Sequence, residues 1–345
     1  MRLNASLSLV SLCAFLIAAP SFAQSNAKPV SAAKAPSTPS SLMIGNMQTV
    51  AATHDDTLVH IGRRHGIGFV EMRAANPTLD PWIPGSGTAV TIPAMNLVPD
   101  APRKGAIINL AEMRVYVFNK GAGTEPTSFS IGIGRDGLQT PVGTTTIVRK
   151  TEDPTWTPTP RMRAEDPTLP PVVYPGPDNP MGTHALYLGF PHIAIHGTNK
   201  PYGIGRRVSS GCIRMFPEDI GKIYHMLPVG TQVTVVDQPI KAGWVNDTFY
   251  IEASPTQEQS TAMEKEGKIP DYEVSETDLA YIMRKAGNDQ DKLDWTAVRK
   301  IIKDRKGYPI EVATRSSNTN NVEKPVVSDT QSPPKPILSS TKPSV

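Results

Sequence analysis

Apolar residues between positions 104 and 237 occur in short runs, several of which alternate with polar residues. A period of two is typical of β-strands, whose successive side chains point to opposite faces. The pattern predicts strands over 106–110, 113–118, 128–133, 144–148, 185–188, 193–196 and 231–236. Between Pro217 and Pro228 the apolar residues recur at helical spacing instead. We therefore expect a region that is mainly β, with one helix.

Shorter segments flank this region on both sides. Residues 47–94 contain two short strands that enclose two helices, which predicts a small βααβ module. Residues 238–313 carry two helical patterns that each begin at a capping residue and end at a glycine, and they predict a C-terminal helical extension. The composition of residues 24–46 is typical of a flexible linker, and that of residues 314–345 of a disordered tail.

The first 23 residues have the pattern of a secretory signal peptide. A basic start precedes an apolar run from Leu7 to Ala19, and small residues at Ser21 and Ala23 form a cleavage site. The run is shorter than the ~20 residues that span a bilayer, and no later stretch reaches that length. We therefore expect residues 1–23 to be removed and the mature protein to be exported without a transmembrane segment.

Charge and cysteine content narrow the range of functions. The 345 residues carry 35 Lys and Arg against 32 Asp and Glu, a formal net charge of +3, which argues against a strongly basic nucleic-acid binder. Of the two cysteines, Cys13 lies in the predicted signal peptide, so the mature chain retains Cys212 alone. A single thiol forms no intramolecular disulfide in an oxidising compartment. Cys212 is therefore either a nucleophile or an inert buried side chain.

A histidine and a glycine-rich loop precede this cysteine. His196 ends a predicted strand, and Cys212 follows 16 residues later, after a loop that can turn back. A thiol needs a base to become a thiolate near neutral pH, and histidine is the usual one. The backbone amides of Ser210, Gly211 and Cys212 are candidates to bind the oxyanion of an attacked carbonyl.

The residues around this pair closely resemble the signature of the L,D-transpeptidase catalytic domain, the YkuD fold. The resemblance rests on two blocks, His196-Gly197-Thr198 and Ser209-Ser210-Gly211-Cys212-Ile213-Arg214. Ser210 stands where the family usually has a histidine, which argues that this position is not the base. The resemblance covers residues 104–237 and implies a YkuD-type β-sandwich there.

The resemblance also implies a mechanism. The Cys212 thiolate attacks the carbonyl between diaminopimelate and the terminal D-Ala of a tetrapeptide stem of peptidoglycan. His196 takes and later returns the proton, and the backbone carbonyl of Gly197 orients its ring. D-Ala leaves, a thioester remains, and an amine then attacks it. This chemistry needs neither a metal nor another cofactor.

Three further segments look like the ErfK/YbiS branch of this family. They are residues 84–88, 91–93 and 177–182. That branch is periplasmic, has an N-terminal LysM-like module, and links the C-terminal Lys of the outer-membrane (Braun) lipoprotein to peptidoglycan. The implied partners are stem peptides, glycan strands and this lipoprotein. Residues 47–94 would then be LysM-like, and they either bind glycan or only position the catalytic domain.

Two other functions stay open at this point. The same fold can make 3→3 cross-links between stems or hydrolyse such bonds, because water and an amine compete for one thioester. A non-catalytic wall-binding protein is the second alternative, although Cys212 and His196 argue against it. The substrate-binding candidates are Arg214, Tyr202, Arg207 and Trp156, and each has a second interpretation. Arg214 either holds a substrate carboxylate or braces the loop, and plain solvated charge is the stronger interpretation of Arg207. Aromatic packing explains Tyr202 and Trp156 equally well. His192 shares a strand face with His196 and is a weaker candidate.

A proline-rich segment interrupts the predicted strands. Nine prolines fall among residues 154–180, a density that neither a central strand nor a helix tolerates. A long ordered loop inside a domain is usually functional. We expect an ordered lid over the Cys212 groove, with Trp156 and Tyr174 as its packing anchors.

Overall fold

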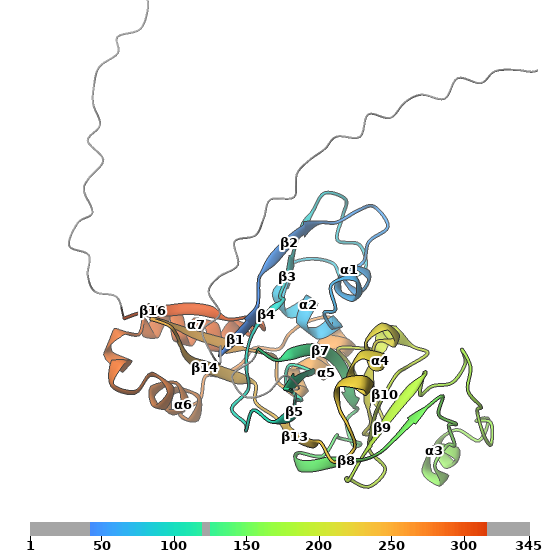
Figure 1. Ribbon diagram of the computed structural model, residues 1–345. Coiled ribbons are helices and arrows are strands. Elements are labelled where there is room, and N and C mark those ends of the chain that lie inside the picture. Colours follow the sequence, from blue (N-terminus) through green and yellow to red (C-terminus); the bar gives the residue numbers. More distant parts are fainter. Residues whose placement is uncertain (1–41, 119–124, 316–345) are drawn as a thin grey trace, which may run out of the picture. The chain divides into compact units, whose positions relative to one another are not determined.

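The computed structural model of the protein describes residues 42–118 and 125–315 (Figure 1). The predicted signal peptide, most of the predicted linker and the predicted tail from residue 316 onward lie outside the described residues. Among the described residues, no helix has the length and apolar character needed to cross a membrane.

The largest sheet contains nine strands in the order β11-β7-β12-β10-β9-β8-β13-β5-β6. Their bounds are β5 Gly105–Asn109, β6 Arg114–Phe118, β7 Thr127–Gly134, β8 Gly143–Glu152, β9 His184–Leu188, β10 Ala194–His196, β11 Arg207–Ser209, β12 Ile213–Met215 and β13 Gln232–Val236. All seven strands predicted in this region are present. The two that were not predicted, β11 and β12, flank Cys212.

The region of the large sheet is mainly β with one helix packed on it, as predicted, and its strands form a single closed ladder. Strand β7 also pairs with β6, so the ladder closes on itself and the strands do not form two separate sheets. The length of β7 explains this closure, because its first half pairs with β6 while its second half pairs with β12 and β11. The enclosed core is apolar and includes Ile108, Val115, Ile195, Ile213 and Val233.

The predicted helix of this region is α4, Pro217–Met226. Pro217 occupies the first turn, where a missing N–H costs no hydrogen bond. Ile220 and Ile223 on one face of α4 join the apolar core, and the helix packs against β9. This part of the prediction is confirmed.

The N-terminal module has the predicted βααβ order. Its elements are β2 Gln48–Ala51, α1 Leu58–Arg64, α2 Phe69–Ala75 and β3 Ala89–Ile92. Strands β2 and β3 pair antiparallel, and Leu58, Ile61 and Met72 build a separate small core beneath them.

The predicted linker ends earlier than residue 46. Residues Met43–Gly45 form strand β1, which pairs antiparallel with β4, Met95–Leu97. The physical reason is burial, because Ile44 packs with Ile107 and Tyr116 of the large sheet.

The C-terminal extension was predicted to be helical, but it also contains strands. The two predicted helices are present as α6, Glu276–Ala286, and α7, Trp295–Asp304. They cover an unpredicted three-stranded sheet of β14 Ile240–Val245, β15 Thr248–Ala253 and β16 Ile310–Thr314. A further helix, α5 Gln257–Glu266, precedes them. Strand β16 includes the first residue of the predicted tail.

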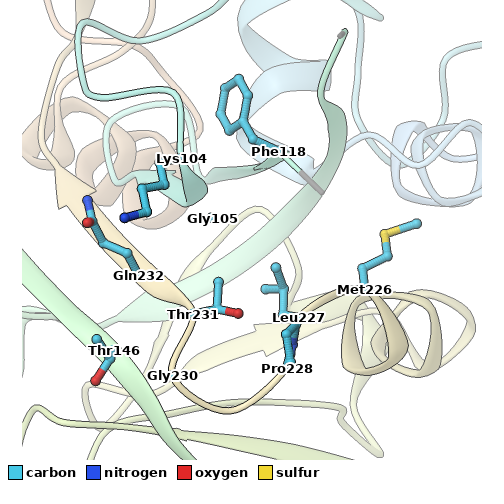
Figure 2. A pocket seen from close by; sticks show the side chains of 10 residues that line it. All are labelled: Lys104, Gly105, Phe118, Thr146, Met226, Leu227, Pro228, Gly230, Thr231 and Gln232. Carbon is cyan, nitrogen blue, oxygen red and sulfur yellow. The ribbon is translucent and has the colours of Figure 1, made fainter. Parts of the chain in front are cut away.

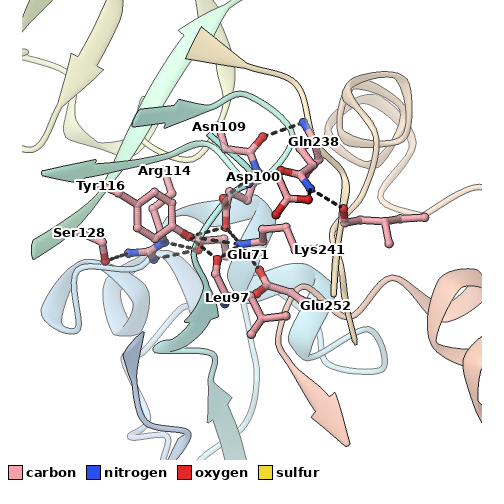
Figure 3. A network of polar contacts seen from close by, with 12 residues as sticks. Glu71, Leu97, Asp100, Asn109, Arg114, Tyr116, Ser128, Gln238, Lys241 and Glu252 are labelled. Carbon is pink, nitrogen blue, oxygen red and sulfur yellow. Dashed lines mark hydrogen bonds and ion pairs between the residues drawn. The ribbon is translucent and has the colours of Figure 1, made fainter. Parts of the chain in front are cut away.

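A buried charged network links the C-terminal sheet to the large one (Figure 3). The Lys241 ammonium lies 2.6 Å from the Glu112 carboxylate and 2.8 Å from that of Glu252, and it donates to the Leu97 carbonyl at 2.6 Å. The Tyr116 hydroxyl donates to Glu112 at 2.8 Å. Burial raises the pKa of Glu252 to about 8, against the opposing effect of Lys241. The network therefore holds one cation between two carboxyl groups away from water.

The proline-rich segment is ordered, and Trp156 pairs with Val173 within it, but the other predicted anchor does not hold it. It contains a short helix, α3 Pro160–Glu165, because Pro160 occupies the first turn and Thr159 caps it. Tyr174 is 75% exposed and anchors nothing. The anchor is the fully buried Asn179, whose side-chain amide donates to the carbonyls of Pro154, Val173 and Tyr174.

Candidate active site

His196 and Cys212 are brought together by parallel pairing of β10 with β12. The register places Ile195 opposite Ile213 and His196 opposite Arg214. Both isoleucines point into the apolar core, so the alternating residues face the other side of the sheet. Cys212, two residues before Arg214, lies on that same outer side. The glycine-rich loop returns the chain to this position, as the sequence predicts.

A cavity of about 730 Å³ lies on this outer side of the sheet. The sheet and the turn that precedes Cys212 form one wall, with Leu138, Arg149, Tyr187, His192, Ala194, His196, Ser209, Ser210, Cys212 and Arg214. Its other wall comes from the proline-rich segment, with Trp156, Thr157, Thr159, Pro160, Arg161, Met162, Pro180 and Met181. The segment therefore lies beside the thiol, where a lid was expected.

The His196 ring is oriented by a backbone carbonyl. Its Nδ1 lies 2.6 Å from the Gly197 oxygen, so Nδ1–H donates to that carbonyl and Nε2 keeps a free lone pair. Burial, and then the positive charge of Arg214, lowers the pKa of His196 to about 4. The imidazole is therefore neutral near pH 7 and able to accept a proton.

The Cys212 thiol is also neutral at rest. Burial raises its pKa, and a hydrogen bond from the Ala194 backbone and then the positive charge of Arg214 oppose this only partly. Its Sγ–H donates to the His192 carbonyl across 3.5 Å. His192 has a φ of +60°, a strained value for a residue with a side chain, and such strain is found at functional sites. A neutral thiol beside a neutral imidazole fits proton transfer at the moment of attack.

Arg214 is a cation beside this pair, and no described residue forms an ion pair with it. Its guanidinium is largely buried, and its Nε has no hydrogen-bond partner among the described residues. Burial lowers the pKa of Arg214, while the neighbouring Cys212 raises it. An uncompensated buried charge is costly, so this position favours an anion.

The turn before Cys212 is fixed by two hydroxyl groups. Ser209 Oγ donates to the Cys212 carbonyl and accepts from the Gly211 N–H at 3.2 Å. Thr140 Oγ1 donates to the Gly211 carbonyl at 2.8 Å. Because the peptide is planar, the Cys212 N–H points away from Thr140. The Gly211 amide is already occupied, so of the three predicted oxyanion donors the amides of Ser210 and Cys212 remain candidates.

Comparison with known proteins agrees with this geometry. The model of the L,D-transpeptidase catalytic domain family, YkuD, matches residues 103–235. Two Escherichia coli K12 proteins, "Probable L,D-transpeptidase ErfK/SrfK" and "Probable L,D-transpeptidase YbiS", are each 37% identical to the chain. The first match covers 285 residues, 80% of this chain and 89% of the relative. The second covers 283 residues, 80% and 90%. The chain belongs to the L,D-transpeptidase family.

Similarity also extends to solved structures. The catalytic domain of the Enterococcus faecium L,D-transpeptidase is 20% identical, covers 40% of this chain and all of its own, and gives a TM-score of 0.32. The family match and the two relatives, not this structural likeness, show that the chain is an enzyme of the L,D-transpeptidase type, and the match at 103–235 agrees with the predicted catalytic region.

Two predicted substrate-binding residues of this L,D-transpeptidase lie away from the cavity. Tyr202 is 52% exposed and contacts His60 of the module at 3.4 Å. Arg207 donates to the Gln257 carbonyl at 3.0 Å and to Thr261 Oγ1 at 2.7 Å, so it braces α5. Trp156 and Arg214 do line the cavity.

Sequence reasoning missed the part that β8 and β9 play in the site. Arg149 and Tyr187 line the cavity from adjacent positions on these strands. The predicted strand ended at residue 148, where the register of β8 shifts at a bulge. Residues 149–152 are all polar and the register shifts just before them, so no pattern in the sequence places Arg149 on the outer side.

The module holds the loop between the two catalytic candidates. The amides of Phe69 and Val70 donate to the carbonyls of Ile204 and Gly205, at 3.3 and 3.1 Å. The Arg206 guanidinium stacks 3.5 Å over the Phe69 ring. This arrangement favours the expectation that the module positions the catalytic domain.

A second cavity, of about 450 Å³, lies at the end of α4 and the start of β13 (Figure 2). Lys104, Phe118 and Leu227 are among its lining residues. No histidine, cysteine or carboxylate lines it, so it has none of the groups that the reaction needs.

Proposed function

We propose that this L,D-transpeptidase uses Cys212 to cleave the bond between diaminopimelate and the terminal D-Ala of a peptidoglycan tetrapeptide stem. The observation that carries the proposal is the His196 ring, whose Nδ1–H is held by the Gly197 carbonyl beside a single thiol. An imidazole fixed in this tautomer presents Nε2 as the base.

The first half of the reaction forms a thioester. The Cys212 proton passes to His196 Nε2 as sulfur attacks the carbonyl carbon, and the amides of Ser210 and Cys212 bind the oxyanion. His196 then protonates the nitrogen of D-Ala, which leaves. Arg214 supplies the positive charge that stabilises sulfur as it becomes anionic.

The second half transfers the acyl group to an amine. We propose the C-terminal Lys of the outer-membrane lipoprotein as the acceptor, in the periplasm, as the likeness to the ErfK/YbiS branch implies. The wall formed by the proline-rich segment supports transfer over hydrolysis, because it limits access of water to the thioester.

The test combines purified enzyme, a tetrapeptide muropeptide and a peptide that ends in Lys, with products identified by mass spectrometry. We expect release of D-Ala and an amide-linked product, and neither with Cys212→Ala. A dimer of two stems would identify 3→3 cross-linking instead, and a free tripeptide would identify hydrolysis. Equal turnover by Cys212→Ala would overturn the nucleophile assignment.

A further inference from the structure

The active-site cavity carries positive charge that nothing nearby neutralises. None of its lining residues is an aspartate or glutamate, while three are arginines. Arg161 is paired with Glu165, which also binds Arg135. Among the described residues, neither Arg149 nor Arg214 has a carboxylate within ion-pair distance. The cavity thus offers two free guanidinium groups to an anionic ligand.

Strand register fixes where Arg149 stands relative to the nucleophile. Arg149 pairs with Tyr187, Tyr187 pairs with Ala194, and the parallel register of β10 and β12 continues this row to Cys212. The Arg149 guanidinium lies 3.6 Å over the Tyr187 ring, and it donates to Thr151 Oγ1 at 3.0 Å. The guanidinium therefore lies over β9, which is two strands away from Cys212. At the usual strand spacing this distance is roughly 10 Å.

This spacing fits a second carboxylate on the donor stem. In a stem peptide, the acidic residue before diaminopimelate is joined through its side chain and keeps a free α-carboxylate. That group lies seven bonds from the attacked carbonyl, roughly 8–9 Å when extended. A guanidinium held flat on an aromatic ring is prepared to bind such a carboxylate through two parallel hydrogen bonds.

We propose that Arg149 is a specificity-determining residue that binds this α-carboxylate, so that the enzyme selects free stems over amidated ones. The inference rests on the proposed acylation by Cys212 and adds the chemical class of the donor. In this proposal Arg214 supplies the positive charge beside the reacting sulfur and does not bind the α-carboxylate.

The test measures kcat/KM for D-Ala release from two disaccharide tetrapeptides that differ only at the second residue, D-glutamate or its α-amide D-isoglutamine. We expect the native enzyme to prefer the acid about tenfold or more. Arg149→Gln should lose about 10- to 100-fold on the acid and little on the amide, and Arg149→Lys should retain part of the preference. Arg161→Gln, which alters a paired arginine of the same cavity, is the control and should keep the preference.

Equal loss on both stems in Arg149→Gln, or no loss on either, would overturn the proposal. The rate at which iodoacetamide alkylates Cys212 reports an intact site independently and should be unchanged in this variant. Failure of the native enzyme to release D-Ala from either stem would overturn the proposed function as well, and that result differs from turnover without preference.

Discussion

At the scale of single residues, the site depends on two neutral groups whose protonation states follow from burial. His196 has a pKa lowered to about 4, and the pKa of Cys212 is raised. The pair therefore differs from a resting thiolate–imidazolium pair, because the proton stays on sulfur until substrate arrives.

The pH profile tests this state directly. Below its pKa, His196 is protonated and accepts no proton, so kcat/KM for D-Ala release should fall only as the pH approaches about 4. An acidic limb between pH 6 and 7 would contradict a desolvated, neutral base.

Substitution separates the roles of the residues that make up the signature. Cys212→Ser should lower D-Ala release by at least about 10²–10⁴-fold, since an alkoxide forms far less readily than a thiolate, and His196→Ala should be similarly impaired. Ser210→His should remain active, because the family usually carries histidine there. An inactive Ser210→His together with an active His196→Ala would show that the base is misassigned.

At the scale of elements, the turn that precedes Cys212 is positioned by Thr140, a residue far from it in sequence. Thr140 accepts from the Gly134 N–H at 3.0 Å while its hydroxyl holds the Gly211 carbonyl, and so it fixes the direction of the Cys212 amide. A hydrogen bond in this position acts on the oxyanion through the peptide plane.

Thr140→Val should therefore lower kcat by about 10–100-fold with little change in KM, and Thr140→Ser should restore most of the loss. Steady-state kinetics of D-Ala release provide the measurement. If KM rises and kcat does not fall, Thr140 acts on substrate binding and not on the oxyanion.

The lid is a second element that can be tested by removal. Trp156 and Val173 pair through hydrogen bonds of 2.9 and 2.8 Å, so the two ends of the segment already lie side by side. Replacing residues 158–172 by a short glycine turn should leave the fold and alkylation of Cys212 intact. It should raise the ratio of hydrolysed tripeptide to transferred product, because water then reaches the thioester. An unchanged ratio, or cleavage of the native segment by proteases, would show that the segment only connects two strands and does not act as a lid.

The sequence predicted most elements of residues 104–237, but it missed the six-residue strands β14 and β15 as well as the short β11 and β12. Strands with sustained alternation, such as β6, have a clear period, whereas β11 and β12 have three residues each and no period to detect. Tyr202 and Arg207 were chosen because they are near Cys212 in sequence, yet the turn sends their side chains elsewhere. Arg149 was missed because the bulge in β8 changes the face of the sheet on which the residues after it lie.

At the scale of the whole molecule, contacts between distant segments hold the parts together. Lys241 meets Glu112 across 129 residues of sequence, a pairing that no local pattern predicts. Because both carboxyl groups are buried with it, the ammonium is the group that compensates them.

Lys241→Met should lower the free energy of unfolding by about 3–5 kcal/mol, since it leaves buried carboxyl groups without their partner. Urea denaturation measures this loss. The pKa of Glu252 is raised to about 8, so the folded state holds an extra proton between about pH 4.5 and 8 and should lose stability as the pH rises through that range. A loss below about 1 kcal/mol in Lys241→Met would mean that the network contributes little.

The contact between the module and the catalytic loop has an evolutionary consequence. Gly68 of the module and Gly205 of the loop meet so closely that a Cβ built on Gly205 would lie 2.4 Å from the Gly68 Cα. The two surfaces fit each other only with glycine at both positions, because a side chain in place of either Gly68 or Gly205 would push them apart. Domain shuffling that replaced this module by an unrelated unit would disturb the loop that leads to Cys212. Exchange of the module would therefore require a matching change in the loop that leads to Cys212.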